Sequence, residues 1–289
     1  MTNQANKSNE LQIEFERGFI NRYFAQISLP HSKLDVSTFT RKSGNFTLDI
    51  ISDSKIGIPY GTYPRLLLAW ICSEATKTQR TELHLGSNQS EFMRKLDISR
   101  QGSTIAMLKE QTTRLVNSLF RVTIEAENSR ARKNILIADS SFEFWETHNG
   151  GWETHLNLNK KFLEDLLAHP VPIDLNVLHA IRKSPMAMDV YTWIAYRTFG
   201  IYTSGGRPVK IPWESLQAQF AANFGGNLNL DVLTADEIIK KEAQALIDFR
   251  RKFLLSLNKL SKFYPELNKT ISSDSQFLTV GGAKLIPLK

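Results

Sequence analysis

Residues 59–120 read PYGTYPRLLLAWICSEATKTQRTELHLGSNQSEFMRKLDISRQGSTIAMLKEQTTRLVNSLF, and this stretch decides the fold. Pro64 suits a first helical turn, because its missing N–H has no intrahelical partner there. Apolar residues then recur at helical spacing until about Gln79. Residues 82–85 alternate polar and apolar and stop at a glycine, which is typical of a short half-buried strand. The stretch therefore begins as a helix followed by a strand.

Two further helices follow this strand. Ser87 or Asn88 can cap the first of them. Residues 97–102 form a polar break that contains glycine, and the next helix carries an apolar stripe from Ile105 to Leu119. Two helices joined by a short Gly-containing turn predict a helix-turn-helix. The strand before it and the β-rich stretch after it favour the winged form.

A hairpin with a basic tip is expected after the third helix. Residues 122–126 and 135–137 flank the tip NSRARK (128–133). A second hairpin is expected around residues 149–151, where Asn-Gly-Gly permits the positive φ of a tight turn. The cations of the first tip are Arg130, Arg132 and Lys133. They could reach a groove or phosphates, although a loop tip can also be basic simply because it is solvated.

The second half repeats this order of elements. Residues 160–178 join the halves, and a helix, a short strand, a helix, a polar loop (222–234), a long helix (237–264) and final strands follow. We therefore expect an α+β fold with two tandem winged-helix domains. The predicted division is a partly disordered N-terminal extension (residues 1–56), a first winged-helix domain (57–165) and a second one (166–289).

The long helix of each half is the candidate DNA-binding element, because a recognition helix meets base edges near its start. Phosphates are favoured at the same helix end. A solvated amphipathic helix would also have a polar outer face, so that alternative stays open. The candidates on the first long helix are Arg100, Gln101, Ser103, Thr104, Lys109 and Arg114. Those on the second, which is the most basic face, are Arg250, Arg251, Lys252, Lys259 and Lys262.

Composition sets outer limits on the function. The 289 residues carry a net charge of +7 with a pI of about 9.4, and 42% of them are hydrophobic. A basic excess favours a polyanionic partner such as nucleic acid, although a basic enzyme would look the same. The lone Cys72 cannot form an internal disulfide. There is no apolar run of 18 residues and no secretory signal pattern, so we expect a cytoplasmic protein.

Catalytic and cofactor motifs do not stand out. The sequence has no phosphate-binding G-x-x-x-x-G-K-[ST] loop, no H-E-x-x-H and no cysteine pair for zinc. It also lacks the His-apolar-His pair of rolling-circle nucleases. We therefore expect no metal, no cofactor and no enzymatic activity.

Several motifs resemble the plasmid RepA-type replication initiators. The longest is IPYGTYPRLLLAW (58–70), and the others are LPHSK (29–33), SEFMRKL (90–96), HPVP (169–172) and DFRRKF (248–253). The similarity extends from about residue 29 to the C-terminus. The loop at 222–234 departs from the family pattern, which leaves the start of the second long helix open.

This resemblance implies an initiator that binds repeated duplex sites at a plasmid origin. It also implies opening of adjacent AT-rich DNA and recruitment of the host replicative helicase and the host initiator. Related initiators often repress their own gene as homodimers. One alternative is a winged-helix transcriptional regulator without a replication role. Another is a nicking initiator, against which the missing histidine pair argues.

Overall fold

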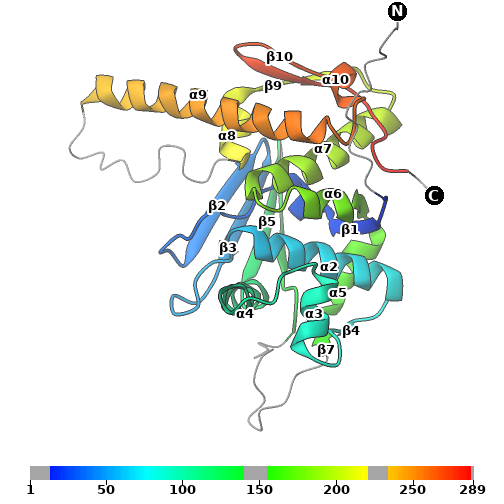
Figure 1. Ribbon diagram of the computed structural model, residues 1–289. Helices are drawn as coiled ribbons and strands as arrows, with labels where there is room; N and C mark the ends of the chain where they lie inside the picture. The colour runs from blue at the N-terminus through cyan, green and yellow to red at the C-terminus, as the bar shows by residue number, and fades with distance from the viewer. Residues whose placement is uncertain (1–13, 140–154, 221–233, 288–289) are drawn as a thin grey trace, which may run out of the picture.

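The computed structural model describes residues 14–139, 155–220 and 234–287. Helices and strands are interspersed along the chain, which confirms the expected α+β class (Figure 1). Three predicted features lie wholly or mostly outside the described residues: the hairpin around residues 149–151, the polar loop before the second long helix, and the polar first ten residues.

The decisive stretch folds in the expected order. Its elements are α2 (Thr62–Thr78), β4 (Glu82–His84), α3 (Gln89–Lys95), α4 (Gly102–Val116), β5 (Leu119–Ala126) and β6 (Ser129–Ile135). Of the two expected caps for α3, Asn88 is the one used, because its side chain accepts a hydrogen bond from the Glu91 N–H. Helix α2 begins after Gly61, whose φ of 77° lies in the left-handed region that favours glycine.

The second half repeats this order, as the sequence predicted. After β7 (His155–Asn157), α5 (Lys160–Ala168), β8 (Pro170–Asp174) and α6 (Leu175–Ala180), it contains α7 (Pro185–Thr203), β9 (Val209–Pro212), α8 (Trp213–Phe220), α9 (Ala235–Leu260), α10 (Leu267–Thr270), β10 (Ile271–Ser273) and β11 (Phe277–Val280). Thr234 and Glu237 form a capping box, which fixes the start of α9. Strands β9, β10 and β11 form one antiparallel sheet in the order β10-β11-β9.

The sheets of the first half are arranged differently. Strand β4 pairs with β7, whereas the β5–β6 hairpin belongs to a four-stranded antiparallel sheet in the order β2-β3-β5-β6. The two added strands come from the N-terminal segment: β2 (Thr38–Ser43) and β3 (Phe46–Ile51). The long edge of β5 is thereby covered by β3 rather than by β4.

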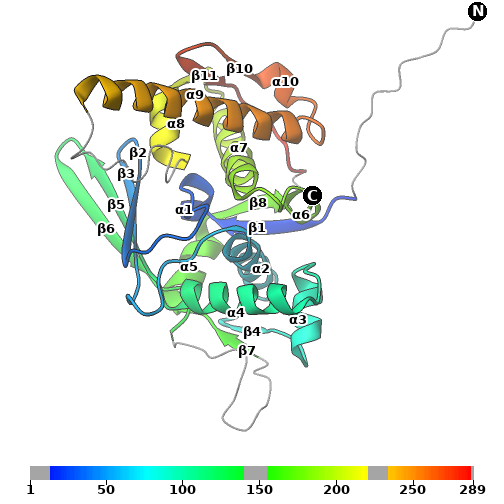
Figure 2. The same cartoon turned by 60° about the vertical axis from the view of Figure 1, so that its left-hand side comes forward.

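The N-terminal segment joins both halves of the chain. Strand β1 (Arg17–Asn21) pairs with β8, and α1 (Arg22–Gln26) packs on α7. Strand β2 also packs against α8. Figure 2 shows α1, β1 and β8 in the middle of the molecule, between the long helices α4 and α9. The predicted division at residues 56 and 165 remains a prediction.

Aromatic side chains form the centre of the second half. Phe253 of α9 makes ring contacts with Trp193 of α7 and with Trp213 and Phe220 of α8. Phe249 and Phe253 are fully buried. Truncating one such phenylalanine to alanine costs about 3–5 kcal/mol in well-packed cores. This packing fixes which face of α9 points inward.

Candidate nucleic-acid interface

The turn between α3 and α4 presents the first candidate residues to solvent. Asp97 takes a φ of 48° and ends α3, and the Ile98 N–H donates back to the Met93 carbonyl at 2.9 Å. A carboxyl oxygen of Asp97 lies 3.3 Å from Arg182, which follows α6 in the chain. This ion pair connects the α3–α4 turn to the segment after α6. The predicted residues Arg100, Gln101 and Ser103 are exposed at the start of α4.

Two of the predicted α4 residues point inward. Thr104 is buried, and Arg114 is only 8% exposed. Arg114 pairs with Glu110 at 2.9 Å and donates from Nη1 to the Ile58 carbonyl at 3.1 Å. It thus connects α4 to the chain before α2, and it cannot reach a ligand outside. We therefore remove Thr104 and Arg114 from the candidate interface; Lys109 is half-buried and stays in it.

The β5–β6 tip carries cations with different roles. Arg132 is exposed, and Arg130 is exposed beside Glu125, with which it pairs. Lys133 instead pairs with Asp165, which also accepts a hydrogen bond from Asn21. Burial would raise the pKa of Asp165, but the hydrogen bonds from Lys133 and Asn21 outweigh it and keep that pKa below its usual range. Lys133 is therefore engaged in holding β6 to α5.

Helix α9 carries the second group of candidates. Arg251 is exposed and pairs with Asp248 at 3.0 Å, and Lys252 and Lys259 are exposed on the same helix. Lys262 is also exposed, but the helix ends at Leu260 rather than near the predicted residue 264, so Lys262 lies in the turn that follows α9. Arg250 is half-buried because its guanidinium lies over the Trp213 ring, 5.6 Å from the ring centre. Four of the five candidate cations of this group therefore reach solvent.

Figure 1 shows α9 from the side but α4 nearly end-on, so the axes of the two long helices are not parallel. In Figure 2, α9 lies near the top of the molecule and α4 in its lower half. Helices α2 and α7 lie between them in that view, and α7 contacts both α9 and α2. The placement of α4 relative to α9 therefore depends on how α2 and α7 are joined.

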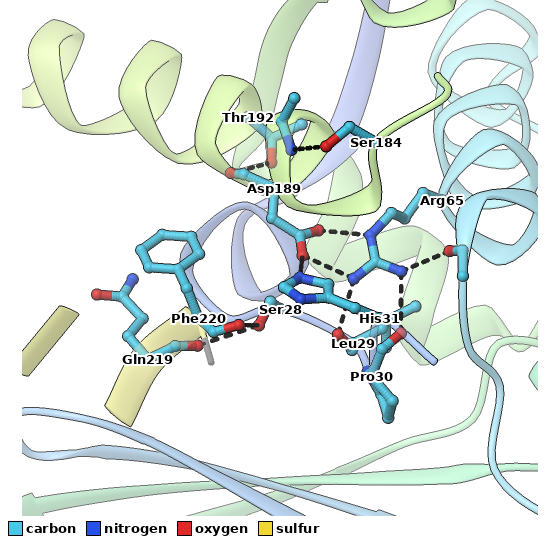
Figure 3. Close-up of polar contacts among 12 residues, drawn as sticks. Ser28, Leu29, Pro30, His31, Arg65, Ser184, Asp189, Thr192, Gln219 and Phe220 are labelled. Atoms are coloured by element: carbon cyan, nitrogen blue, oxygen red, sulfur yellow. Dashed lines mark hydrogen bonds and ion pairs between the residues drawn. The ribbon is translucent and has the colours of Figure 1, made fainter. Parts of the chain in front are cut away.

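A buried ion cluster joins these two helices (Figure 3). Arg65 of α2 donates from Nε and Nη2 to both carboxyl oxygens of Asp189 on α7, at 2.7 and 2.6 Å. The same guanidinium donates to the Leu29 carbonyl at 2.7 Å, and His31 Nε2 lies 2.8 Å from Asp189 Oδ2. We call Arg65, Asp189 and His31 the hub.

The electrostatics of the hub follow from its burial. Arg65 is 5% and Asp189 8% exposed. Burial alone would raise the pKa of Asp189, but the Arg65 charge and the hydrogen bonds from His31 and Arg65 outweigh it and hold the pKa below its usual range. Burial lowers the pKa of His31 by more than Asp189 raises it. The cluster therefore contains a carboxylate paired with a guanidinium, and a histidine that resists protonation.

A family model described as "Plasmid encoded RepA protein" matches residues 58–214. The chain belongs to the plasmid RepA family. In this RepA-family chain the matched range includes two hub residues, Arg65 and Asp189, and all of α4 and β9.

Two crystal structures resemble the RepA-family chain over most of its length. A selenomethionine structure of domains 2 and 3 of RctB has a TM-score of 0.48 at 10% identity, covering 91% of this chain and 97% of that one. A second structure of RctB domains 2–3 has a TM-score of 0.44 at 10% identity, covering 88% of this chain and 84% of that one. No curated protein matches the chain.

The hub was not among the site residues expected from the RepA-family sequence. Two signals were available: Arg65 stands in the run Pro64–Leu68, which is otherwise apolar, and Asp189 stands in the apolar run MAMDVYTWIA (186–195). A charged residue on the buried face of a helix is rarely left without a partner. The pairing itself joins residues 124 positions apart, which no local pattern specifies.

Two further observations apply to the parts of the chain that the structure describes. None of the helices there combines the length and apolarity needed to cross a membrane. No three His, Cys, Asp or Glu side chains in those parts gather where they could hold a metal ion.

Proposed function

We propose that this chain initiates plasmid replication by binding repeated duplex sites at the origin through two winged-helix domains. Family membership supports the plasmid role. The observation that carries the proposal is the repeated order of elements, in which α4 and α9 occupy corresponding places and each presents exposed cations or polar side chains. Each long helix would enter a major groove, and the two grooves would lie about one helical turn apart.

The strand arrangement supports a winged helix more directly in the second half. There β9, the strand between the first two helices, pairs with the β10–β11 hairpin that follows the long helix. In the first half the corresponding hairpin β5–β6 is extended by β2 and β3, and β4 pairs with β7. The exposed Arg130 and Arg132 at the β5–β6 tip would approach phosphates beside the α4 groove.

In this proposal the protein acts by binding alone, in the cytoplasm, and makes or breaks no covalent bond. Binding would promote opening of the adjacent DNA and recruit the host helicase and host initiator, and a homodimer would serve to repress its own gene. A regulator without a replication role would bind DNA equally well. Replication of a plasmid that depends on this gene and its flanking DNA separates the two, and a nicking assay on supercoiled plasmid with divalent metal tests for an enzyme.

The interface itself is tested by gel-shift titration at two salt concentrations, with a duplex selected by footprinting on DNA that flanks the gene and a scrambled duplex. Arg251→Ala with Lys262→Ala should weaken binding to both duplexes and lower the salt slope by about 2, because two phosphate contacts are lost. Arg100→Ala or Ser103→Ala should mainly reduce the preference for the specific duplex.

A matched control removes the same charge elsewhere. Lys77 and Arg80 are exposed at the end of α2. Lys77→Ala with Arg80→Ala should leave both affinities and the salt slope unchanged. Equal losses from this control and from the α9 pair would contradict the proposed interface, and equal effects of Arg100→Ala on both duplexes would contradict direct base readout by Arg100.

A further inference from the structure

The solvent face of α9 carries more than positive charge. Four exposed residues of α9 at spacings of 4, 4 and 3 fall within an arc of about 80° at about 100° per residue, and the exposed Lys262 follows in the turn just after the helix. We call them the α9 stripe: Ile247, Arg251, Leu255, Asn258 and Lys262. Two of them are large aliphatic side chains, and Ile247 is 60% and Leu255 55% exposed.

The core of the second half does not account for these aliphatic residues. The inward face of α9 already provides Phe249, Phe253 and Leu260, each fully buried. Among the residues that the structure describes, three of the eight exposed large hydrophobic side chains lie on this one helix. Burying an isoleucine or leucine stabilises a complex by about 1.5–3 kcal/mol, so this face has binding energy that the folded monomer does not use.

The charge of the stripe favours duplex DNA as its occupant. Arg251 and Lys262 lie in the stripe, and the exposed Lys252 and Lys259 flank it on one side. The acidic group beside it is Asp248, which pairs with Arg251 at 3.0 Å. A second copy of this helix would bring like charges together, whereas a polyanion matches them.

The chemistry of the stripe also matches base edges better than phosphates alone. Phosphate contacts need cations and polar donors, and gain nothing from an isoleucine or a leucine. In the major groove thymine presents a methyl group, and adenine pairs with asparagine. A face that carries two aliphatic side chains and an asparagine is therefore suited to a thymine-bearing sequence.

We propose that Ile247 and Leu255 contact the methyl groups of two thymines in the major groove that α9 enters. This rests on the proposed function, since it assigns sequence preference within the α9 groove. The eight residue steps from Ile247 to Leu255 span about 12 Å along the helix axis. That is the length of three to four base pairs, so the two thymines should be separated by about that distance.

Uracil substitution tests the proposal directly, because deoxyuridine lacks only the thymine methyl. Wild-type protein is titrated by gel shift against the footprinted duplex and against duplexes with single thymine-to-uracil changes in the α9 half-site. Two positions should each weaken binding about fourfold, the value of one buried methyl group. Ile247→Ala should weaken binding to the thymine duplex and abolish the effect of uracil at one of these two positions. Leu255→Ala should do the same at the other position.

Ile239→Ala is the matched control, because Ile239 is 62% exposed on the same helix but outside the stripe. It should bind like the wild type and keep full uracil sensitivity. All three variants remove exposed atoms and should unfold at the wild-type temperature. The salt slope should stay constant, because no cation is removed.

The outcomes separate the two levels of the proposal. If the wild type shows no preference for the footprinted duplex over a scrambled one, the proposed function itself fails. If that preference is present but no uracil position matters, or if Ile247→Ala and Leu255→Ala keep wild-type uracil sensitivity, the methyl-contact proposal is overturned. It is also overturned if these two variants only shift a monomer–dimer equilibrium measured by sedimentation.

Discussion

Replacing Asp189 with asparagine should strongly destabilise the protein. The carboxylate receives two hydrogen bonds from Arg65 and lies 2.8 Å from His31 Nε2. Asparagine has nearly the same shape but no charge, so the guanidinium of Arg65, 5% exposed, would be left buried without its counter-ion. Removing one partner of a buried ion pair costs about 3–5 kcal/mol.

For a protein of this size, each kcal/mol lowers Tm by about 2–4 °C, so we expect a fall of about 6–20 °C. Thermal unfolding followed by circular dichroism at pH 7.5 measures it. Asp174→Asn is the matched control. Asp174 is 5% exposed and accepts backbone hydrogen bonds from Glu16 and Asn176, and burial raises its pKa. The charge of Asp174 is therefore not stabilised as that of Asp189 is, and Asp174→Asn should lower Tm by much less than Asp189→Asn.

A second variant tests the electrostatic reason. Arg65→Met combined with Asp189→Leu removes both charges and should recover much of the stability lost in Asp189→Asn, because replacing a whole buried ion pair by apolar residues is often neutral. A Tm for Asp189→Asn within about 1 °C of the wild type would refute the reasoning. So would an equal fall in Asp174→Asn.

Two further predictions concern buried titratable groups. Burial lowers the folded-state pKa of His31, so the contribution of His31 to stability is complete above the unfolded pKa of about 6.5 and is lost as the pH falls below that value. The urea concentration at the unfolding midpoint should therefore be lower at pH 5 than at pH 7.5, and this difference should be smaller in His31→Gln. An unchanged pH dependence in that variant would contradict this role. Burial raises the pKa of the Cys72 thiol to about 12, so its reaction with a thiol reagent at pH 8 should be on the order of a thousandfold slower than in the unfolded chain, as followed by absorbance. Rapid labelling of the native protein would show that α2 opens locally.

Local signals in the sequence determined most of the elements. Pro64, the cap at Asn88 and the glycine-containing break at 97–102 specified the helix-turn-helix order, because capping and turn residues act within a few positions. The same patterns predicted the repeated order in the second half. The resemblance carried by residues 58–70 led to the family that the match over 58–214 shows.

Pairings between distant segments were decided only by the tertiary structure. The addition of β2 and β3 to the β5–β6 hairpin depends on register between strands about seventy residues apart, and β1 with β8 on a still longer separation. The inward orientation of Arg114 was likewise not readable, because a cation at the edge of an apolar stripe can either snorkel to solvent or find a buried partner such as Glu110 and the Ile58 carbonyl. The hub was likewise not predictable from the sequence, because Arg65 and Asp189 are stable inside the protein only when folding brings each next to the other.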